Sequence, residues 1–459
     1  MRESQANLPG NPRRPTAFHA RWPTALVLFL LCLSPLRAAP RLSFLENEEI
    51  KVGIDLDLGG AITWLSGRDG ENRINNFDHG RQVQLSYFSG PVPFEVPRQK
   101  PAGHWRHLGW NPIQAGDDFD HGSRILEHQN DGGEIYVKCV PLQWPLNQVE
   151  GECTFESWLT LEGKVVKARA RLVNARSDPT QYPARLQELP AVYANAAFHR
   201  VVSYTGPLPY SGEPATSIPP PATRHPWSFW LGTEQWSALL DGNDQGIGLI
   251  TPGRIWFTGG FAGRPGHNDT KANDTGYLAG QGLEILDHNI VHEFSYELVV
   301  GSLEEIRVRA SAHAPAKLPS WRFENDRQGW HYRDARDTGW PISGSLEVIP
   351  DGPDPQLVSP PVLWQAEEAP WLIIEASFPP ETRRATVYWR HWGQDTPGAE
   401  DHLDFPLPEG GQISRHVLHL GGRDTYKGPL VQLRLDPATS GDGSSRVRVK
   451  SISLHSSPP

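Results

Sequence analysis

Residues 51–65 read KVGIDLDLGGAITWL, and this stretch decides the fold class. Apolar and polar side chains alternate through its first part, as they do in a half-buried β-strand. Gly59 and Gly60 interrupt the alternation, and a second apolar run begins at Ala61. Paired glycines between two such runs are typical of a turn. The stretch therefore predicts two short strands joined by a glycine turn.

The same pattern recurs along most of the chain. The 44 Gly and 43 Pro are spread without a fixed period, and they separate short runs rich in Val, Thr and aromatic residues. Runs at 134–140, 154–161, 165–173 and 292–300 have the length and composition of strands, and no helical pattern separates them. Strands that succeed one another in this way favour antiparallel sheets over a βαβ arrangement. We predict an all-β fold.

The length of 459 residues exceeds that of one typical domain. We expect a large antiparallel β domain at 41–315, a short linker reading AKLPS at 316–320, and a second module at 321–459. The second module has the size of an ordinary single domain. We expect it to be a smaller, jelly-roll-like accessory β-sandwich.

The first 39 residues have the order of a secretory signal peptide. Four arginines precede an apolar run at 25–33, and Ala38 and Ala39 follow it. The run is shorter than the roughly 20 residues that span a bilayer. We expect a secreted or periplasmic mature protein without a membrane span. Arg37 stands where a small residue is usual, so an uncleaved N-terminal anchor is the alternative.

Export leaves two cysteines, Cys139 and Cys153. An oxidising compartment permits a disulfide, and the Pro and Gly residues between the two cysteines suggest a loop that brings them together. Such a bridge contributes roughly 3 kcal/mol in the chain-entropy treatment. Two buried free thiols are the alternative.

Charge and motifs exclude several classes of function. The formal charge is −10 and no run of Lys and Arg stands out, so nucleic acid is not an expected partner. The sequence has no glycine-rich phosphate loop, serine nucleophile elbow or Cys/His zinc spacing, and we expect neither a cofactor nor a metal. Residues 241–246 have calcium-loop residue types, but Pro252 occupies the position of the last ligand. We expect a hairpin turn there. The sequence does not predict the oligomeric state.

Polar and aromatic side chains concentrate between residues 72 and 121. Such side chains bind hydroxyl-rich ligands through paired donors and acceptors, and Trp offers a flat apolar face to a sugar ring. We predict one wall of a carbohydrate site here. The predicted substrate-binding residues are His79, Arg81, Gln82, Tyr87, Trp110, Asn111, Gln114 and His121. A Trp-rich β core is the alternative explanation for the 17 Trp of the chain.

Three carboxyl groups are candidates for catalysis, namely Glu188, Asp78 and Asp117. Glycoside hydrolysis needs one protonated and one ionised carboxyl group. Apolar neighbours on both sides of Glu188 predict desolvation, which raises a carboxyl pKa. The alternative for Glu188 is a structural salt bridge to Arg185 or Arg81. Asp78 has an alternative as a turn cap, and Asp117 as a solvated loop residue.

Residues 51–84 resemble the start of galactose-mutarotase-like supersandwich domains. Those domains commonly open with a strand, a Gly-rich bend, a second strand and a turn that leads to a segment bearing Asn and Asp. The stretch WSALLDGNDQGIGLITP at 236–252 looks like a late strand pair in the same folds. The resemblance covers about residues 41–310. It implies a supersandwich fold and a carbohydrate ligand, because such domains occur in mutarotases, glycoside hydrolases and polysaccharide lyases.

Four functions follow as hypotheses. The first is a glycoside hydrolase acting on a poly- or oligosaccharide through a carboxylate pair. The second is a polysaccharide lyase that holds a uronate with Arg81, His79 and Tyr87, which share a face if the strand is regular. The third is a glycan-binding protein without catalysis. The fourth, ranked below the hydrolase, is a mutarotase-like site using His292 and Glu293.

Overall fold

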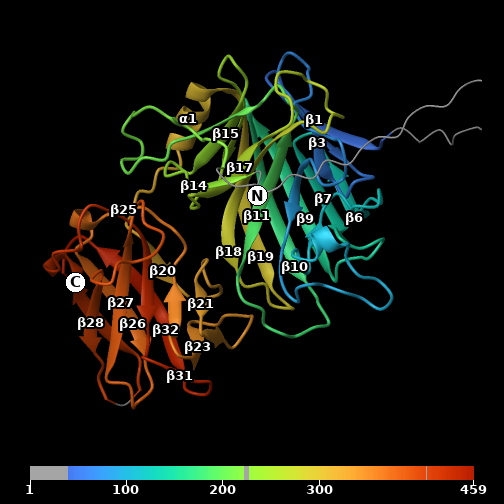
Figure 1. The fold of residues 1–459 in the computed structure, drawn as a ribbon. Helices are drawn as coiled ribbons and strands as arrows, with labels where there is room; N and C mark the ends of the chain where they lie inside the picture. The colour runs from blue at the N-terminus through green and yellow to red at the C-terminus, as the bar shows by residue number, and fades with distance from the viewer. Residues whose placement is uncertain (1–39, 222–226, 410, 459) are drawn as a thin grey trace, which may run out of the picture. The chain divides into compact units, whose positions relative to one another are not determined.

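The computed structural model describes residues 40–221, 227–409 and 411–458. The predicted signal peptide lies outside these residues. Almost all regular secondary structure of the described chain is antiparallel strand, and the predicted all-β fold class is confirmed (Figure 1). Among the described residues, no helix is long and apolar enough to cross a membrane.

A ten-stranded sheet carries the N-terminal strands. Its main path, in spatial order, is β1 (Leu42–Glu46), β2 (Lys51–Asp55), β3 (Ala61–Ser66), β4 (Val83–Ser86), β11 (Arg185–Ala194), β18 (Thr275–Glu284), β17 (Trp256–Ala262) and β14 (Ser228–Leu231). Two short strands, β5 (Pro112–Ile113) and β8 (Leu142–Gln143), extend it from β4. The predicted glycine turn joins β2 to β3, with Gly59 and Gly60 at positive φ.

A nine-stranded sheet packs on the ten-stranded one. Its strands, in spatial order, are β13 (Thr216–Ser217), β12 (Arg200–Ser203), β15 (Trp236–Leu240), β16 (Gln245–Ile250), β19 (Val291–Ser302), β10 (Val165–Asn174), β9 (Cys153–Glu162), β7 (Glu134–Val140) and β6 (Arg124–Asn130). The predicted hairpin turn at 241–246 joins β15 to β16, where Leu240 pairs with Gly246.

The first core lies between these two sheets, and strand alternation explains it. On β10, Ala168, Ala170 and Leu172 are buried in the core, while Lys167 and Arg169 point outward. Successive side chains of a strand face opposite sides, so each strand gives one row to the core and one row to the outside.

One α-helix, α1 (Leu303–Ser311), follows β19. Ser302 accepts a hydrogen bond from the backbone of Glu305, and the Glu305 side chain reaches back to the backbone of Ser302. This capping box satisfies donors that a helix start leaves unpaired. The helix was not predicted, because nine residues with a weak apolar periodicity carry little signal. Among the described residues there are also three 3₁₀ turns: η1 (Gly103–Trp105), η2 (Ala366–Glu368) and η3 (Leu420–Gly422).

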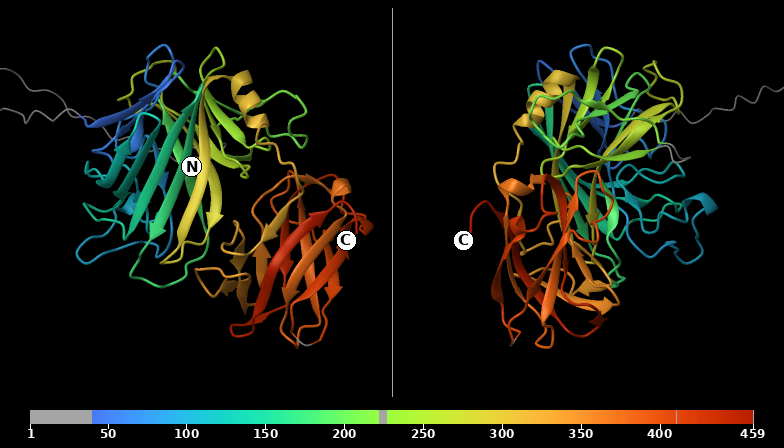
Figure 2. Two further views of the ribbon diagram at one scale, coloured as in Figure 1. Left: turned by 180° about the vertical axis from the view of Figure 1, so that it is seen from behind. Right: turned by 60° about the vertical axis from the view of Figure 1, so that its left-hand side comes forward.

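The C-terminal strands form a second pair of sheets with its own core (Figure 2). One sheet contains β22 (Ala335–Asp337), β23 (Leu346–Gly352), β32 (Val447–His455), β26 (Trp371–Ser377), β29 (Ser414–His419), β20 (Ser320–Arg322) and β31 (Gly441–Asp442). The other contains β21 (His331–Arg333), β24 (Gln356–Val358), β30 (Pro429–Asp436), β27 (Arg384–His391), β28 (His402–Pro406) and β25 (Trp364–Gln365).

The predicted disulfide is wrong, because Cys139 and Cys153 are buried free thiols. The strand register gives the reason. Cys139 on β7 pairs with Phe155 on β9, which places Cys153 diagonally across the two strands. Diagonal neighbours are about 7 Å apart, whereas the Cβ atoms of a disulfide are about 4 Å apart. The alternative of two buried thiols is the one that the structure adopts.

Candidate functional site

The side of the ten-stranded sheet that faces away from the core gathers polar and aromatic side chains, and we call it the outer face. On β4, Val83 and Leu85 belong to the core, so Gln84 and Ser86 lie on the outer face. On β18, Leu278 belongs to the core. The outer residues of β18 are therefore Tyr277, Ala279, Gln281 and Leu283.

A β-bulge brings Glu188 to the same face as Tyr193. The register of β11 on β18 pairs Glu188 with Gln281 and Tyr193 with Tyr277, and it shifts between Glu188 and Ala191. Without that shift, Glu188 and Tyr193 would lie on opposite faces, because they are five residues apart. A bulge inserts one extra residue and re-aims the side chains beyond it.

Glu188 is held by neutral groups. The Tyr277 hydroxyl donates a hydrogen bond to its carboxylate, and Ser86 lies opposite it on β4. Burial raises the pKa of Glu188, although the hydrogen bonds from Tyr277 and Ser86 partly lower it. A carboxyl group with a raised pKa retains its proton to higher pH than an exposed one.

The structural salt bridge considered for Glu188 is not present among the described ion pairs. Arg185 instead donates its guanidinium hydrogens to the backbone oxygens of Leu108, His107 and Ser89. These contacts fix the loop before β5. Glu188 is therefore a desolvated carboxyl group without a cationic partner in the described part of the chain.

The Tyr277 ring, whose hydroxyl contacts Glu188, belongs to a cluster of three aromatic rings. The Tyr277 ring lies 4.7 Å from that of Tyr193 and 4.8 Å from that of Trp227, centroid to centroid. Ala191 and Ala279 form the floor beneath them. Small floor residues leave the space in which the Tyr277 ring reaches Glu188. Burial raises the pKa of Tyr193 and Tyr277 well above 10, and the nearby Glu188 contributes a smaller rise. Both phenols therefore keep their protons at neutral pH.

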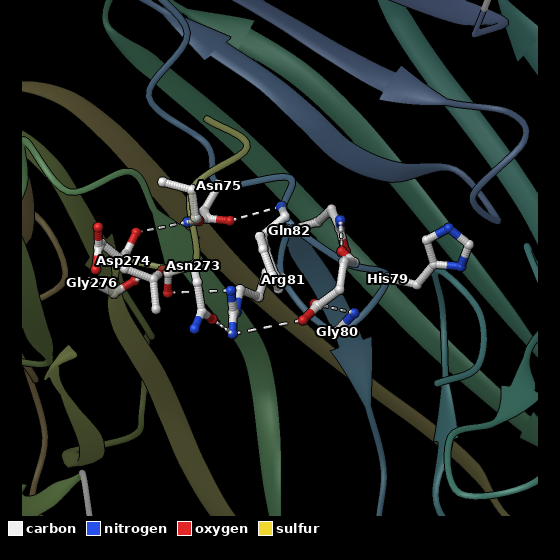
Figure 3. Close-up of polar contacts among 12 residues, drawn as sticks. Asn75, His79, Gly80, Arg81, Gln82, Asn273, Asp274 and Gly276 are labelled. Atoms are coloured by element: carbon white, nitrogen blue, oxygen red, sulfur yellow. Dashed lines mark hydrogen bonds and ion pairs between the residues drawn. The ribbon is translucent and has the colours of Figure 1, made fainter. Parts of the chain in front are cut away.

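Asp78 and Arg81 lie beside this aromatic cluster, in the turn before β4. Their charges act on Tyr193 in opposite directions, with Arg81 lowering its pKa and Asp78 raising it. The Arg81 guanidinium donates to the side-chain oxygen of Asn273 at 2.6 Å and lies 3.7 Å from the carboxylate of Asp78 (Figure 3). Asp78 also accepts a hydrogen bond from the backbone of Gly80 at 2.9 Å, which is the turn cap considered as the alternative to a catalytic role.

Gln82 and His79 support this turn. Gln82 is buried and donates to the backbone oxygen of Asp78 at 2.6 Å. The His79 ring points away from Arg81 (Figure 3), and its Nδ1 lies 3.1 Å from the backbone oxygen of His121. The two side chains hold the loop that presents Asp78 and Arg81.

Four predicted substrate-binding residues serve the fold in the structure. Tyr87 and Trp110 are fully buried in the first core. Asn111 donates to the backbone oxygen of Tyr87 at 2.9 Å. Gln114 accepts from the backbone of Leu85 and donates to that of Gly59, both at 3.1 Å. The expected common face of Arg81 and Tyr87 is wrong, because β4 begins at Val83 and Arg81 lies in the preceding turn.

Asp117 is the centre of a closed loop. Its buried carboxylate accepts hydrogen bonds from the backbones of Phe119, His121 and Gln148, and it forms an ion pair with the His121 ring at 3.0 Å. These partners use both carboxylate oxygens. The structure therefore does not bring Asp117 to the outer face with Glu188 and Asp78.

His292 and Glu293 lie on opposite sides of β19, as expected of adjacent strand residues. His292 is buried, 3.1 Å from the hydroxyl of Tyr87 and 3.5 Å from the carboxylate of Glu284. Glu293 is paired with Arg171 on the outside of the nine-stranded sheet. The two residues do not share one site.

Metal ligation gains no support from the described residues. No group of three or more His, Cys, Asp or Glu side chains is arranged there to hold an ion.

Sequence reasoning missed several outer-face residues. Tyr193, Tyr277, Trp227 and Asn273 were not predicted as site residues. Their common location depends on strands that are adjacent in space but about 80 residues apart in the chain. The alternation Tyr277, Ala279, Gln281 was a usable signal for a half-buried strand.

Comparisons with known proteins concern the fold. No protein-family model matches the chain, and no curated protein matches it. A galactose mutarotase-like protein from Lactobacillus casei ATCC 334 aligns at 12% identity and TM-score 0.35, covering 56% of this chain and 99% of that one. A putative aldose 1-epimerase from Escherichia coli K12 aligns at 12% identity and TM-score 0.38, covering 58% and 100%.

A third match is the 4-alpha-glucanotransferase from Thermococcus litoralis. It aligns at 11% identity and TM-score 0.32, covering 58% of this chain and 40% of that one. The first two descriptions agree with the galactose-mutarotase-like fold that the sequence resembles. With identities and TM-scores this low, we base no argument about activity on these matches.

Proposed function

We propose that this protein is a carbohydrate-active enzyme that binds a saccharide on the outer face and uses Glu188 as a general acid. The observation that carries the proposal is a desolvated carboxyl group that has no cationic partner among the described residues. It accepts a hydrogen bond from Tyr277, whose ring packs against Tyr193 and Trp227. Structural carboxylates are commonly paired with cations, whereas a general acid needs a raised pKa.

The chemistry of the face suits a saccharide ligand. Tyr193 and Trp227 are half-buried, and their rings offer surfaces that suit the C–H groups of a sugar. Gln281 and Arg81 add amide and guanidinium donors for hydroxyl groups. Few other small ligands combine apolar faces with so many hydroxyls.

Glycoside hydrolysis is the reaction that we favour. Protonated Glu188 would donate its proton to the leaving glycosidic oxygen. Asp78, which lies 3.7 Å from the guanidinium of Arg81, would activate water or attack the sugar carbon. Both carboxyl groups act electrostatically on the hydroxyl of Tyr193, which is the support for placing them at one site.

A uronate lyase is the second candidate. Arg81 lies near Tyr193, and a guanidinium beside a phenol suits the neutralisation of a uronate carboxylate. The protonated phenols of Tyr193 and Tyr277 would serve as proton donors and not as bases. Arg81 already contacts Asp78 and Asn273, which makes it less available to a ligand.

The test is turnover of a polysaccharide panel by wild type and Glu188→Gln, with reducing ends and near-ultraviolet absorbance read together. We expect new reducing ends without absorbance, and a loss of about 10²- to 10⁴-fold in kcat for Glu188→Gln. Glutamine still accepts the Tyr277 hydrogen bond, so the melting temperature should stay close to that of wild type.

Glu127→Gln is the matched control, since Glu127 is exposed on β6 of the other sheet. It should keep full activity. Near-ultraviolet absorbance that rises together with the reducing ends would contradict the hydrolase and favour the lyase. Glycan binding without turnover in wild type would reject the enzyme altogether.

We also propose that the chain is exported. The support is the order of arginines, apolar run and small residues in the first 39 residues. N-terminal sequencing of protein recovered from the periplasm or medium should begin near residue 40. Recovery of an intact Met1 in a membrane fraction would favour the anchor.

A further inference from the structure

The outer face continues past Glu188 towards the far edge of the ten-stranded sheet. Gln281 lies opposite Glu188, and Leu283 follows it on the same face of β18. On the next strand, β17, Phe257 belongs to the core, so its neighbour Trp256 lies on the outer face. These outer-face side chains therefore form one row, which runs from Glu188 through Gln281 and Leu283 to Trp256.

Two cavities follow this row. The first, of about 220 Å³, is lined by Gln281, Leu283 and Trp256 together with Pro361. The second, of about 580 Å³, shares Leu283, Trp256 and Pro361 with the first and extends to Trp392. Shared lining residues make the two cavities neighbours. They form one path that begins opposite Glu188 and ends at Trp392.

The second cavity has the lining of a saccharide subsite. Its aromatic residues are Phe229, Trp230, Trp256 and Trp392. The Trp392 side chain directly follows β27 and is 37% exposed. Arg390 lies beside it, donating to the side-chain oxygen of Gln432 at 2.9 Å and to the backbone oxygen of Gln394 at 2.7 Å. Aromatic walls with a few fixed polar groups are typical of small-ligand sites.

We infer that this second cavity is a distal subsite, in which Trp392 and Trp256 hold sugar rings of a chain whose reacting unit lies at Glu188. The inference rests on the proposed function for the identity of the ligand. It makes that proposal more specific, because a distal subsite implies a substrate that is several sugars long. It also gives the C-terminal β-sandwich a part in substrate binding.

The experiment compares wild type with Trp392→Ala. The probes are starch, xylan, pectin, alginate and mixed-linkage β-glucan, each as polymer and as its di- and trisaccharide fragments. Polymer affinity is measured by retardation in native gels, and fragment affinity by calorimetry. We expect Trp392→Ala to weaken binding of the recognised polymer about tenfold, because a bound sugar chain would cover this exposed ring and lose the contact on truncation. Fragment binding should change less than about twofold.

Two variants accompany Trp392→Ala. Trp392→Tyr keeps an aromatic face and should recover most of the polymer affinity. Trp371→Ala removes a half-buried Trp that stacks on His419 in the other sheet of the same sandwich, and it should bind polymer as wild type does. Circular dichroism and melting temperature check that each variant is folded.

Three results would overturn the inference. They are no retardation of wild type by any of the polymers, unchanged polymer binding by Trp392→Ala, and equal loss for polymer and fragments. Binding that depends on Trp392 without any turnover would leave the subsite standing and reject the enzymatic proposal. The failure of the proposed function and that of the subsite are thereby distinguished.

Discussion

The pKa of Glu188 is the residue property on which the proposed chemistry depends. Burial raises it, and the hydrogen bond from Tyr277 lowers it. Tyr277→Phe removes only the second effect, so the pKa of Glu188 should rise further. A general acid is active while it is protonated. We therefore expect the alkaline limb of the kcat/KM profile to move to higher pH in Tyr277→Phe.

The measurement is the pH dependence of kcat/KM on the polysaccharide that wild type cleaves. Tyr136→Phe is the control, because Tyr136 stacks on Trp158 on the outside of the nine-stranded sheet. Its profile should coincide with that of wild type. An alkaline limb that stays in place or moves to lower pH in Tyr277→Phe would show that Glu188 is not the acid.

For single residues, the sequence predicted a property correctly where neighbours in the chain determine the environment of the side chain. The desolvation of Glu188 was predicted from its apolar neighbours in the chain, and burial does raise its pKa. Asp117 was also a candidate in sequence, with a loop residue as the alternative, and its carboxylate is occupied by the backbone of its own loop. The side chains that face Glu188 come from other strands, and one sequence does not show which strands are adjacent.

The paired strands β7 and β9 lead to a prediction about redox conditions. Cys139 and Cys153 are free thiols, and burial raises the pKa of both. Buried protonated thiols react slowly. The melting temperature should therefore be the same with and without a phosphine reductant. A disulfide would contribute roughly 3 kcal/mol, so a clear drop on reduction would contradict the free thiols.

Alternation predicted the regular strands and failed at the irregular ones. The expected strand at 134–140 is β7 residue for residue, and the expected run at 165–173 differs from β10 by one residue. The bulge after Glu188 interrupts the period of two, so β11 was seen only as an apolar run with a polar insertion. The same bulge places Glu188 and Tyr193 on one face. The element that was hardest to predict is therefore the one that builds the candidate site.

At the scale of the whole molecule, the two largest apolar cores of the described residues account for most of the fold. One lies between the ten- and nine-stranded sheets, and the other among the C-terminal strands. Composition predicted both, because short apolar runs continue to the C-terminus with a break near residue 316. It did not predict the buried charges of the C-terminal strands, since burial of a charge depends on which partner meets it in space.

Arg327 is the centre of such a buried cluster. It forms ion pairs with Asp287 at 2.6 Å and Asp337 at 2.5 Å, and all three side chains are at most 4% exposed. Gln181 donates to both carboxylates. Arg327→Met leaves two buried carboxylates without their cation, which costs about 3–5 kcal/mol. We expect a clearly lower melting temperature at pH 7.

The loss of stability caused by Arg327→Met should be smaller at acid pH. Burial opposes the ionisation of Asp337, but Arg327 lowers its pKa overall. In wild type the stabilisation is therefore present above the ordinary carboxyl pKa and is lost as the pH falls through the lowered one. In Arg327→Met the buried Asp337 carboxyl takes up a proton more readily, so calorimetry should find a smaller difference from wild type at pH 4 than at pH 7. Arg336→Met breaks an exposed pair with Asp351 and should cost only about 0–1 kcal/mol. Equal effects of the two substitutions would show that the Arg327 cluster is not desolvated.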